Sequence, residues 1–184
     1  SLRFASRDGV RGVYLVFDGK AILGTRARKI RSKSYSAFES INYPVAAFID
    51  ENRIIQYVDG ESRDGTVRFY ENLKPSVFVL KLIPGLSADI LDYLAERYEA
   101  VVIEGFGIGG VPSTERQKFC EKITTFLDKG RTLVITTQVP LEGSDLSVYE
   151  VGRLFRKDER VLEAYNMTLE AIVTKLMWLL ACTK

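Results

Sequence analysis

The stretch Val77-Phe78-Val79-Leu80-Lys81-Leu82-Ile83 is the part of the sequence that decides the fold. It is almost entirely apolar, and Pro84-Gly85 follows it directly. A short continuous apolar run that ends in such a turn signal predicts a strand buried on both faces. We therefore expect a sheet covered on both sides to begin here.

Strands and helices are expected to alternate along the rest of the chain. The expected elements are a helix from an N-cap at Ser87 to about Tyr98, a strand at 100–103, a helix capped near Ser113 that ends before Gly130, a strand at 132–136 and a helix from about Thr168 to the end. In the second helix one apolar face is formed by Phe119, Ile123, Phe126 and Leu127. This alternation predicts an α/β fold with a small parallel sheet flanked by helices.

The earlier part of the chain predicts antiparallel strands instead. Strands are expected at 13–17, 21–23, 45–49 and 54–58, the last two joined by a turn around Asn52. Asp18-Gly19 between the first two is a strong hairpin signal. The basic segment 25–36 is poor in apolar residues and predicts irregular structure. The chain is thus expected to have a lobe at 1–58 that contains a β-hairpin, a linker at 59–76 and an α/β lobe at 77–184.

Composition and charge exclude several classes of protein. The 184 residues are 46% hydrophobic and 27% charged, which is typical of a globular chain. A net charge of +2 does not favour nucleic acid or a membrane surface as the main partner. No apolar run reaches the roughly 18 residues that a membrane-spanning helix needs. The two cysteines, Cys120 and Cys182, are too few for a disulfide framework and favour the reducing cytoplasm.

The sequence contains no histidine. This excludes Ser-His-Asp and Cys-His triads within the chain, and also the commonest metal ligand. Any chemistry must use Lys, Asp, Glu, Thr, Ser or Tyr, and we expect no metal.

Gly105, Gly107 and Gly110 form a G-x-G-x-x-G pattern between a predicted strand and a helix. This pattern occurs in dinucleotide-binding folds, where the backbone approaches a pyrophosphate at a helix N-terminus. However, the next strand ends in Thr136-Thr137-Gln138 without the expected acidic residue, and Pro112 delays the helix. We therefore favour a tight turn that lets another loop or chain approach closely, and expect no cofactor.

The segment 25–33 concentrates five positive charges in nine residues. Such a run is usually a solvated loop or an anion-binding surface. Alternatively, one of its lysines points inward and passes protons to a hydroxyl nucleophile. Composition leaves both interpretations open.

An ordered set of motifs resembles the bacterial L-asparaginases, and most closely their cytoplasmic type I branch. The motifs are Gly12 to Lys20, Gly24 to Lys29, Ala37 to Pro44, Ile83-Pro84-Gly85, Glu104 to Gly109, Thr136-Thr137-Gln138, Gly143 to Tyr149, Met167 to Ala171 and Thr174-Lys175-Leu176. Each motif alone is weakly specific, but together they cover nearly the whole chain in the family's order.

The resemblance implies a catalytic role for Lys29. In that family a threonine from a T-G-G-T segment attacks the side-chain amide of asparagine, and water then hydrolyses the acyl-enzyme. A second threonine and an aspartate, from an H-G-T-D-T segment, form a proton relay with a lysine. Neither segment occurs in this sequence, whereas Lys29 matches the relay lysine. The chain therefore resembles the C-terminal portion of the enzyme, and we expect it to be inactive alone.

The resemblance also implies a homo-oligomer, because the family's active site lies between two subunits. The loops 105–112 and 138–145 match the places where one subunit closes over another. On these loops we expect Gly107, Gly109 and Gly110 at the interface, and Glu142 and Asp145 near the amino group of the substrate L-asparagine. Many members carry asparagine where this chain has Gly110, so that contact differs here.

Two alternatives remain open on the sequence alone. The chain is also similar to the asparaginase-like component of the tRNA-dependent amidotransferases, which has the same fold and acts on a charged tRNA. It is otherwise a non-catalytic α/β domain that binds a nucleotide or an anion at the glycine loop. The sequence does not decide between asparagine and glutamine as substrate.

Overall fold

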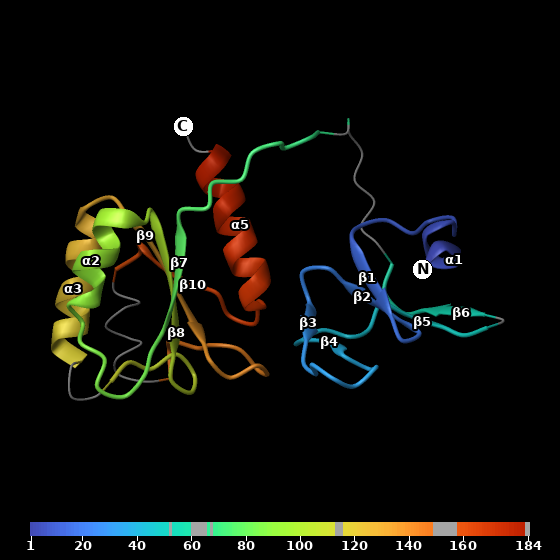
Figure 1. The fold of residues 1–184 in the computed structure, drawn as a ribbon, viewed down its shortest axis with the longest axis horizontal. Helices are drawn as coiled ribbons and strands as arrows, with labels where there is room; N and C mark the ends of the chain where they lie inside the picture. The colour runs from blue at the N-terminus through green and yellow to red at the C-terminus, as the bar shows by residue number, and fades with distance from the viewer. Residues whose placement is uncertain (52, 60–65, 67, 113–115, 149–157, 183–184) are drawn as a thin grey trace. The chain divides into compact units, whose positions relative to one another are not determined.

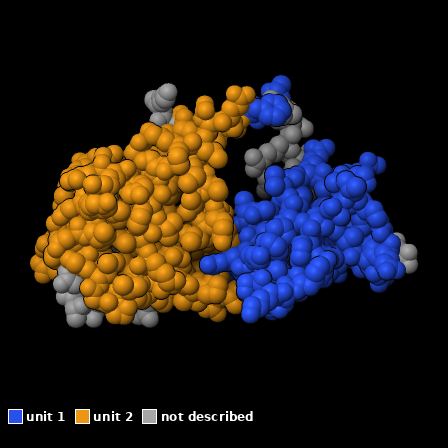
Figure 2. Space-filling model, in the orientation of Figure 1, with its two compact units in different colours: residues 1–69 blue, residues 70–184 orange. Residues whose placement is uncertain are grey.

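The computed structural model describes residues 1–51, 53–59, 66, 68–112, 116–148 and 158–182 (Figure 1). The chain divides into two compact units, which are residues 1–69 and residues 70–184 (Figure 2). The expected turn around Asn52 and the expected cap near Ser113 lie outside the described residues.

The first unit is built from short antiparallel strands. Its elements are α1 (Leu2–Ala5), β1 (Tyr14–Phe17), β2 (Lys20–Leu23), β3 (Ala27–Lys29), β4 (Phe38–Ser40), β5 (Ala47–Ile49) and β6 (Ile54–Gln56). Strands β1, β2, β5 and β6 form one sheet in this order, and β3 pairs with β4 in a separate ribbon. In the β1–β2 hairpin, Phe17 lies opposite Lys20, while Asp18 and Gly19 have φ of 49° and 68°. Two central residues with positive φ are what a type I′ turn requires, so the predicted hairpin is confirmed.

The core of the first unit is small. Phe4, Ala21 and Ala47 form one buried cluster with half-buried side chains such as Val16 around it. The other buried apolar residues of the unit's described part are Ile22, Ala37, Ile41 and Ala46. Phe4 packs edge-on against Tyr14, with 5.2 Å between the ring centroids. All four residues of β1 stay half-buried.

The second unit has a four-stranded parallel sheet. Its elements are β7 (Val77–Lys81), α2 (Ile90–Arg97), β8 (Ala100–Gly105), α3 (Arg116–Asp128), β9 (Thr132–Thr137), β10 (Val161–Glu163) and α5 (Leu169–Cys182). The strand order is β10-β9-β8-β7, and every neighbouring pair is parallel. Helices α2 and α3 cover one face of the sheet and α5 covers the other (Figure 1). The predicted α/β architecture is confirmed.

Alternation along the strands explains the two layers of this core. On β8, Val101 and Ile103 belong to the cluster under α2 and α3, whereas Ala100 and Val102 belong to the cluster under α5. Successive side chains of a strand point to opposite faces, so a continuous apolar strand fills both layers. The predicted apolar face of α3 is confirmed, because Phe119, Ile123, Phe126 and Leu127 are all buried in the first of these clusters.

Of the three expected helix starts, two lie within the described residues, and one of these two is correct. Helix α5 begins at Leu169, as predicted to within one residue, and the Thr168 hydroxyl caps it by accepting a hydrogen bond from the Ala171 N–H at 3.3 Å. Ser87 does not cap α2, because the helix begins at Ile90 after Asp89. The Ser87 hydroxyl instead accepts a hydrogen bond from the Asp89 N–H at 3.3 Å and so caps the preceding turn.

Strand β10 was not expected from the sequence. It consists of only three residues, which are half-buried, exposed and half-buried in turn. Such a short element has no apolar run that distinguishes it from a loop. Its parallel pairing with β9 defines it.

Residues 70–76 are the first residues of the second unit, and they pack against its last helix, α5. The Lys74 N–H donates to the Met177 carbonyl of α5 at 2.9 Å, and the Lys74 ammonium lies 2.6 Å from the Glu99 carboxylate. The Tyr70 ring meets the Trp178 ring edge-on, with 5.2 Å between their centroids. These contacts hold the segment that leads into β7 against α5.

Candidate functional site

Lys29, the lysine that the sequence singles out, ends strand β3. It lies opposite Phe38 of β4 in an antiparallel register. The expected irregular structure across 25–36 is therefore wrong for β3. The expectation failed because a charged run has no strand periodicity of its own, whereas here pairing and packing define the strand. Phe38 packs edge-on against Phe17 of β1, with 5.4 Å between the centroids.

The two faces of the β3–β4 ribbon carry different groups. Residues directly opposite each other in an antiparallel pair share a face, so Lys29 shares the face of Phe38, and Arg28 shares the face of Glu39. Arg31 lies 3.4 Å from the Glu39 carboxylate and also donates to the Ser36 carbonyl at 2.9 Å. The acidic residue of the ribbon thus lies on the face away from Lys29.

Some cations of the basic stretch, residues 25–33, contact neighbouring side chains, and others are exposed. The Arg26 guanidinium lies over the Tyr43 ring, 5.4 Å from its centroid. Lys29 is exposed, and within the described residues its ammonium group has neither a hydrogen bond nor an ion pair. The arginines therefore stabilise the ribbon, whereas Lys29 remains accessible.

The glycine loop, residues 105–110, folds back on the end of β8. Phe106 and Gly110 exchange backbone hydrogen bonds of 2.8 Å and 2.7 Å. A Cβ atom added to Gly105 would lie 2.7 Å from the carbonyl carbon of Gly109. Glycine at 105 is therefore required by the loop's own backbone.

The other glycines of this loop differ in their surroundings. Gly107 is exposed with φ of 50°, and Gly109 is buried with φ of 117°. A Cβ atom on Gly109 would lie 3.1 Å from Leu146 of the next loop. Gly110 has no positive φ, and its nearest neighbour would be the Phe106 carbonyl oxygen at 3.4 Å. Only Gly110 has room for a side chain without backbone strain.

This geometry favours the tight-turn interpretation over dinucleotide binding. The N–H groups of Phe106, Gly109 and Gly110 are bonded to carbonyl oxygens within the loop itself, so they are not available to a pyrophosphate. Helix α3 begins only at Arg116 among the described residues. The pattern therefore encodes a self-contacting turn.

The loops that follow β8, β9 and β10 are bonded to one another. The Asp145 N–H donates to the Ile108 carbonyl at 3.0 Å, and the Ser144 N–H donates to the Tyr165 carbonyl at 3.0 Å. The Leu146 N–H donates to the Glu163 carboxylate at 2.8 Å. Glu163 lies on the unexpected strand β10, so no pattern in the sequence indicated its role. These loops meet at the carboxyl ends of the strands, where open α/β sheets usually hold their ligands.

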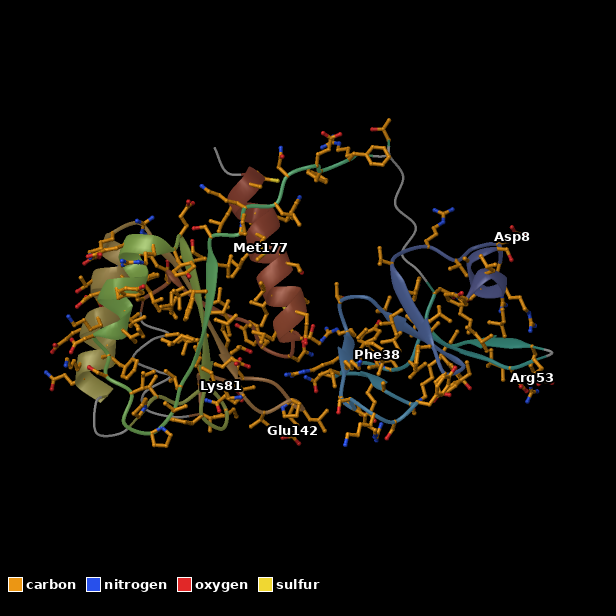
Figure 3. All side chains as sticks on the ribbon, viewed as in Figure 1. Asp8, Phe38, Arg53, Lys81, Glu142 and Met177 are labelled. Carbon is orange, nitrogen blue, oxygen red and sulfur yellow. The ribbon has the colours of Figure 1, made fainter. Side chains whose placement is uncertain are left out.

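The two predicted acidic residues of this edge differ in their bonding. The Asp145 carboxylate accepts hydrogen bonds from the Ser147 N–H at 2.8 Å and from its hydroxyl at 2.5 Å. It therefore caps its own loop. Glu142 is exposed in the loop that follows β9 and has φ of 75° (Figure 3).

Thr137 and Gln138, at the end of β9, also link the segments at this edge of the sheet. The Gln138 carboxamide nitrogen donates to the Leu82 carbonyl at 2.6 Å and to the Glu104 carbonyl at 3.0 Å. The Thr137 hydroxyl donates to the Gly107 carbonyl. The sequence indicated these residues only as part of a motif and predicted no role for them.

The shifted pKa values belong to ion pairs outside these loops. A hydrogen bond from Lys118 of α3, assisted by Ser87, lowers the pKa of Asp89 from 3.8 to about 2. A hydrogen bond to Asp92 raises the pKa of Lys122. These pairs join α2 to α3 and mark no catalytic group.

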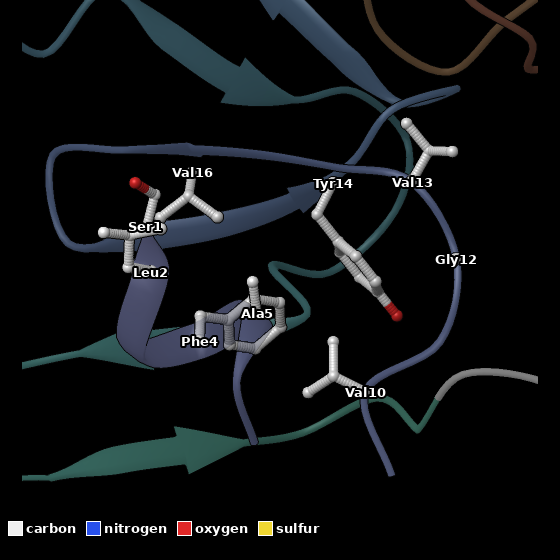
Figure 4. A pocket seen from close by; sticks show the side chains of 9 residues that line it. All are labelled: Ser1, Leu2, Phe4, Ala5, Val10, Gly12, Val13, Tyr14 and Val16. Carbon is white, nitrogen blue, oxygen red and sulfur yellow. The ribbon is translucent and has the colours of Figure 1, made fainter. Parts of the chain in front are cut away.

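A pocket of about 480 Å³ lies in the first unit beside α1 and β1 (Figure 4). Its lining is mainly apolar and includes Phe4, Val10 and Val16. Within the described residues, no group of three or more His, Cys, Asp or Glu side chains is arranged to hold a metal ion. Among these residues, no helix is long and apolar enough to cross a membrane.

The predicted site residues thus fall into two sets. Gly107, Gly109 and Gly110 are brought together with the loop of Glu142 and Asp145 at the carboxyl edge of the second unit. Lys29 lies in the first unit.

Both units match known families. Residues 76–184 match the Glutaminase/Asparaginase C-terminal domain, and residues 1–61 match the family described as Asparaginase, N-terminal. The chain belongs to the asparaginase family. Membership agrees with the resemblance inferred from the ordered motifs.

Individual relatives extend the family assignment. The chain is 37% identical to L-asparaginase of Thermococcus kodakarensis over 184 residues, which is 100% of this chain and 55% of the relative. It is 32% identical to one component of the glutamyl-tRNA(Gln) amidotransferase of Pyrococcus furiosus, over 87% of this chain and 36% of that protein. The chain therefore spans about half the length, or less, of these two asparaginase-family relatives.

Solved structures show the same fold. The thermostable L-asparaginase from Thermococcus kodakarensis superposes with a TM-score of 0.89 at 36% identity, covering 98% of this chain and 54% of that one. L-asparaginase I from Vibrio cholerae superposes with a TM-score of 0.81 at 23% identity, covering 95% of this chain and 52% of that one.

Proposed function

We propose that this chain is part of an L-asparaginase, which hydrolyses the side-chain amide of L-asparagine to L-aspartate and ammonia. The observation that carries the proposal is the family match over both units, together with 37% identity to an L-asparaginase along the whole chain. That relative is nearly twice as long, so the proposed activity is that of a longer protein.

In this proposal Lys29 belongs to the proton relay. The nucleophilic threonine and the threonine–aspartate pair of the relay come from the T-G-G-T and H-G-T-D-T segments, which this sequence does not contain. The threonine oxygen bonds to the amide carbon, ammonia leaves, and water hydrolyses the resulting ester to aspartate. A charged lysine beside the aspartate keeps the relay hydrogen-bonded. The exposed ammonium of Lys29 supports this role, and the 184-residue chain alone is inactive.

The loops at the carboxyl edge of the second unit close over the active site of a neighbouring subunit in a homo-oligomer. Gly107, Gly109 and Gly110 form the contact surface, and an acidic residue binds the amino group of the substrate. Glu142 and Asp145 are the two candidates, and both lie in the loop that follows β9. We further assign the protein to the cytoplasmic type I branch, on the strength of its motifs.

The role of Lys29 is tested by substitution in the full-length protein. Lys29→Met should lower the rate of ammonia release from asparagine by about 10²–10⁴-fold, the usual contribution of a residue in acid–base catalysis. Lys33→Met is the matched control, because Lys33 is an exposed lysine of the same basic stretch. Near-normal activity of a folded Lys29→Met protein contradicts the assignment.

A tRNA-dependent amidotransferase is the second candidate, because the chain is 32% identical to a component of such an enzyme. The two functions differ in their dependence on tRNA. An L-asparaginase releases ammonia from free asparagine without tRNA. Amide hydrolysis that requires a charged tRNA and a partner protein favours the amidotransferase instead.

A nucleotide-binding role for the glycine loop predicts that NAD or ATP raises the melting temperature saturably. We expect no such shift, because the N–H groups of Phe106, Gly109 and Gly110 are already bonded within the loop. A saturable shift would favour the non-catalytic binding domain.

A further inference from the structure

We propose that Thr137 and Gln138 are positioning residues that hold the glycine loop in the geometry needed for substrate binding. This inference rests on the proposed function, in which the loop closes over the active site of a neighbouring subunit. Both residues lie at the carboxyl end of β9, and each is bonded to a different part of the edge.

The Gln138 carboxamide links the residue that follows β7 to the backbone at the end of β8, just before the glycine loop. Its nitrogen faces two carbonyl oxygens, those of Leu82 and Glu104, at 2.6 Å and 3.0 Å. Because both neighbours are acceptors, the amide must present its nitrogen and not its oxygen to them. The Gln138 N–H also donates to the Gly105 carbonyl at 3.1 Å. Through its side chain and its backbone N–H, Gln138 thus continues the hydrogen bonding of the sheet one residue beyond β9.

The Thr137 hydroxyl holds the tip of the same loop. It donates to the carbonyl of Gly107, which has φ of 50° and is exposed. It also accepts a hydrogen bond from the Val139 N–H at 2.9 Å. Thr137 itself is only 9% exposed, so its hydroxyl has a fixed position.

The Thr137 bond attaches the tip of the loop to β9, and the Gln138 bonds hold the end of β8 from which the loop starts. A loop that is held to within a fraction of an ångström makes its contacts without a further loss of conformational entropy on binding. Loosening it should weaken substrate binding more than the chemical step, since neither side chain takes part in the proton relay.

Steady-state kinetics of the full-length protein test this inference. Thr137→Val and Gln138→Met remove the hydrogen bonds at nearly constant volume, and each should raise KM for asparagine about tenfold while kcat changes by less than about threefold. Thr137→Ser keeps the hydroxyl and should restore KM. Thr136→Val is the matched control, because Thr136 is buried one residue earlier and its hydroxyl has no hydrogen bond within the described residues.

Hydrogen exchange of the 184-residue chain gives an independent measurement. In both variants the amides of residues 105–110 should exchange about tenfold faster than in the parent, and faster than with Thr136→Val, while the strand amides stay protected. Unchanged exchange, an unchanged KM, or equal effects of Thr136→Val overturn the inference. A full-length parent that releases no ammonia contradicts the proposed function, whereas the exchange result still decides whether these residues hold the loop.

Discussion

The two units of the chain bury their sheets to different extents. In the second unit every residue of β8 is buried, with α2 and α3 on one face and α5 on the other. In the first unit every residue of β1 is only half-buried, and four of the seven apolar residues buried in its described part are alanines. A sheet covered on both faces provides a large core, whereas a sheet covered in part provides little stability of its own.

This difference separates two requirements of the proposed active site. The loops at the carboxyl edge need a rigid base, and two of them follow β8 and β9, which are almost entirely buried. Lys29 needs access to reacting groups, and it lies at the end of a ribbon strand in the unit with the smaller core. We expect substitutions in the second unit to affect stability strongly, and comparable substitutions in the first unit to affect it weakly.

The largest difference is expected between two phenylalanines. Phe119 of α3 is completely buried, so Phe119→Ala should lower the free energy of unfolding by about 3–5 kcal/mol through lost contacts and a cavity. Phe48 of β5 is 43% exposed and contacts Tyr57 edge-on, so Phe48→Ala should cost about 1 kcal/mol. Urea denaturation measures both values. Equal losses would contradict the proposed difference between the two cores.

The second prediction concerns the glycine loop. Gly105→Ala places a Cβ atom 2.7 Å from backbone and should cost about 1–3 kcal/mol, because the loop must shift. Gly110→Ala should change stability by less than about 0.5 kcal/mol, since its nearest contact is 3.4 Å. Chemical denaturation of both variants tests the prediction. If Gly110→Ala were the more harmful substitution, the described turn would be wrong.

The hairpin turn of the first unit provides a smaller effect. Gly19 has φ of 68°, and a side chain in this left-handed region costs about 1–2 kcal/mol. Gly19→Ala should therefore lower the free energy of unfolding of the first unit by about 1 kcal/mol. Asp18→Asn is the matched control, because Asn-Gly suits the same turn and should leave stability unchanged. Thermal unfolding followed by circular dichroism distinguishes the variants.

The smallest effect is expected from pH and the surface ion pair of the second unit. The pKa of Asp89 is lowered from 3.8 to about 2 in the folded protein, so its contribution to stability is present above about pH 4 and is lost as the pH falls toward 2. Asp89→Asn should reduce the fall in melting temperature between about pH 5 and pH 2.5. Lys118→Met should have a similar effect, because Lys118 is the main cause of the shift. An undiminished fall in both variants would contradict this.

The fold of the second unit was largely predictable, because its signals are local. Continuous apolar strands, the N-cap Thr168 and the apolar face of α3 each depend on a few neighbouring residues. Strands β3, β4 and β10 were missed because all three are short and are defined by their pairing with another strand and not by a local pattern. Lys29 lies opposite Phe38, and Val161 lies opposite Leu133.

The candidate site was predictable only in part. The ordered motifs indicated Lys29 and the two loops, and the family match agrees with the resemblance that they carry. The bonds of Gln138 to Leu82 and Glu104 could not be foreseen, because they join three segments at a sheet edge. The capping role of Asp145 depends on its own loop conformation, which the composition of that loop does not specify.

The contacts of Tyr70 and Lys74 with α5 have a practical consequence for exchanging parts between relatives. A chimaera joined directly before Val77 would replace these residues with foreign ones and expose the side of α5 that they cover. A junction before Tyr70 would transfer the helix together with its covering segment. The better junction for recombination with a relative therefore lies before Tyr70 and not directly before β7.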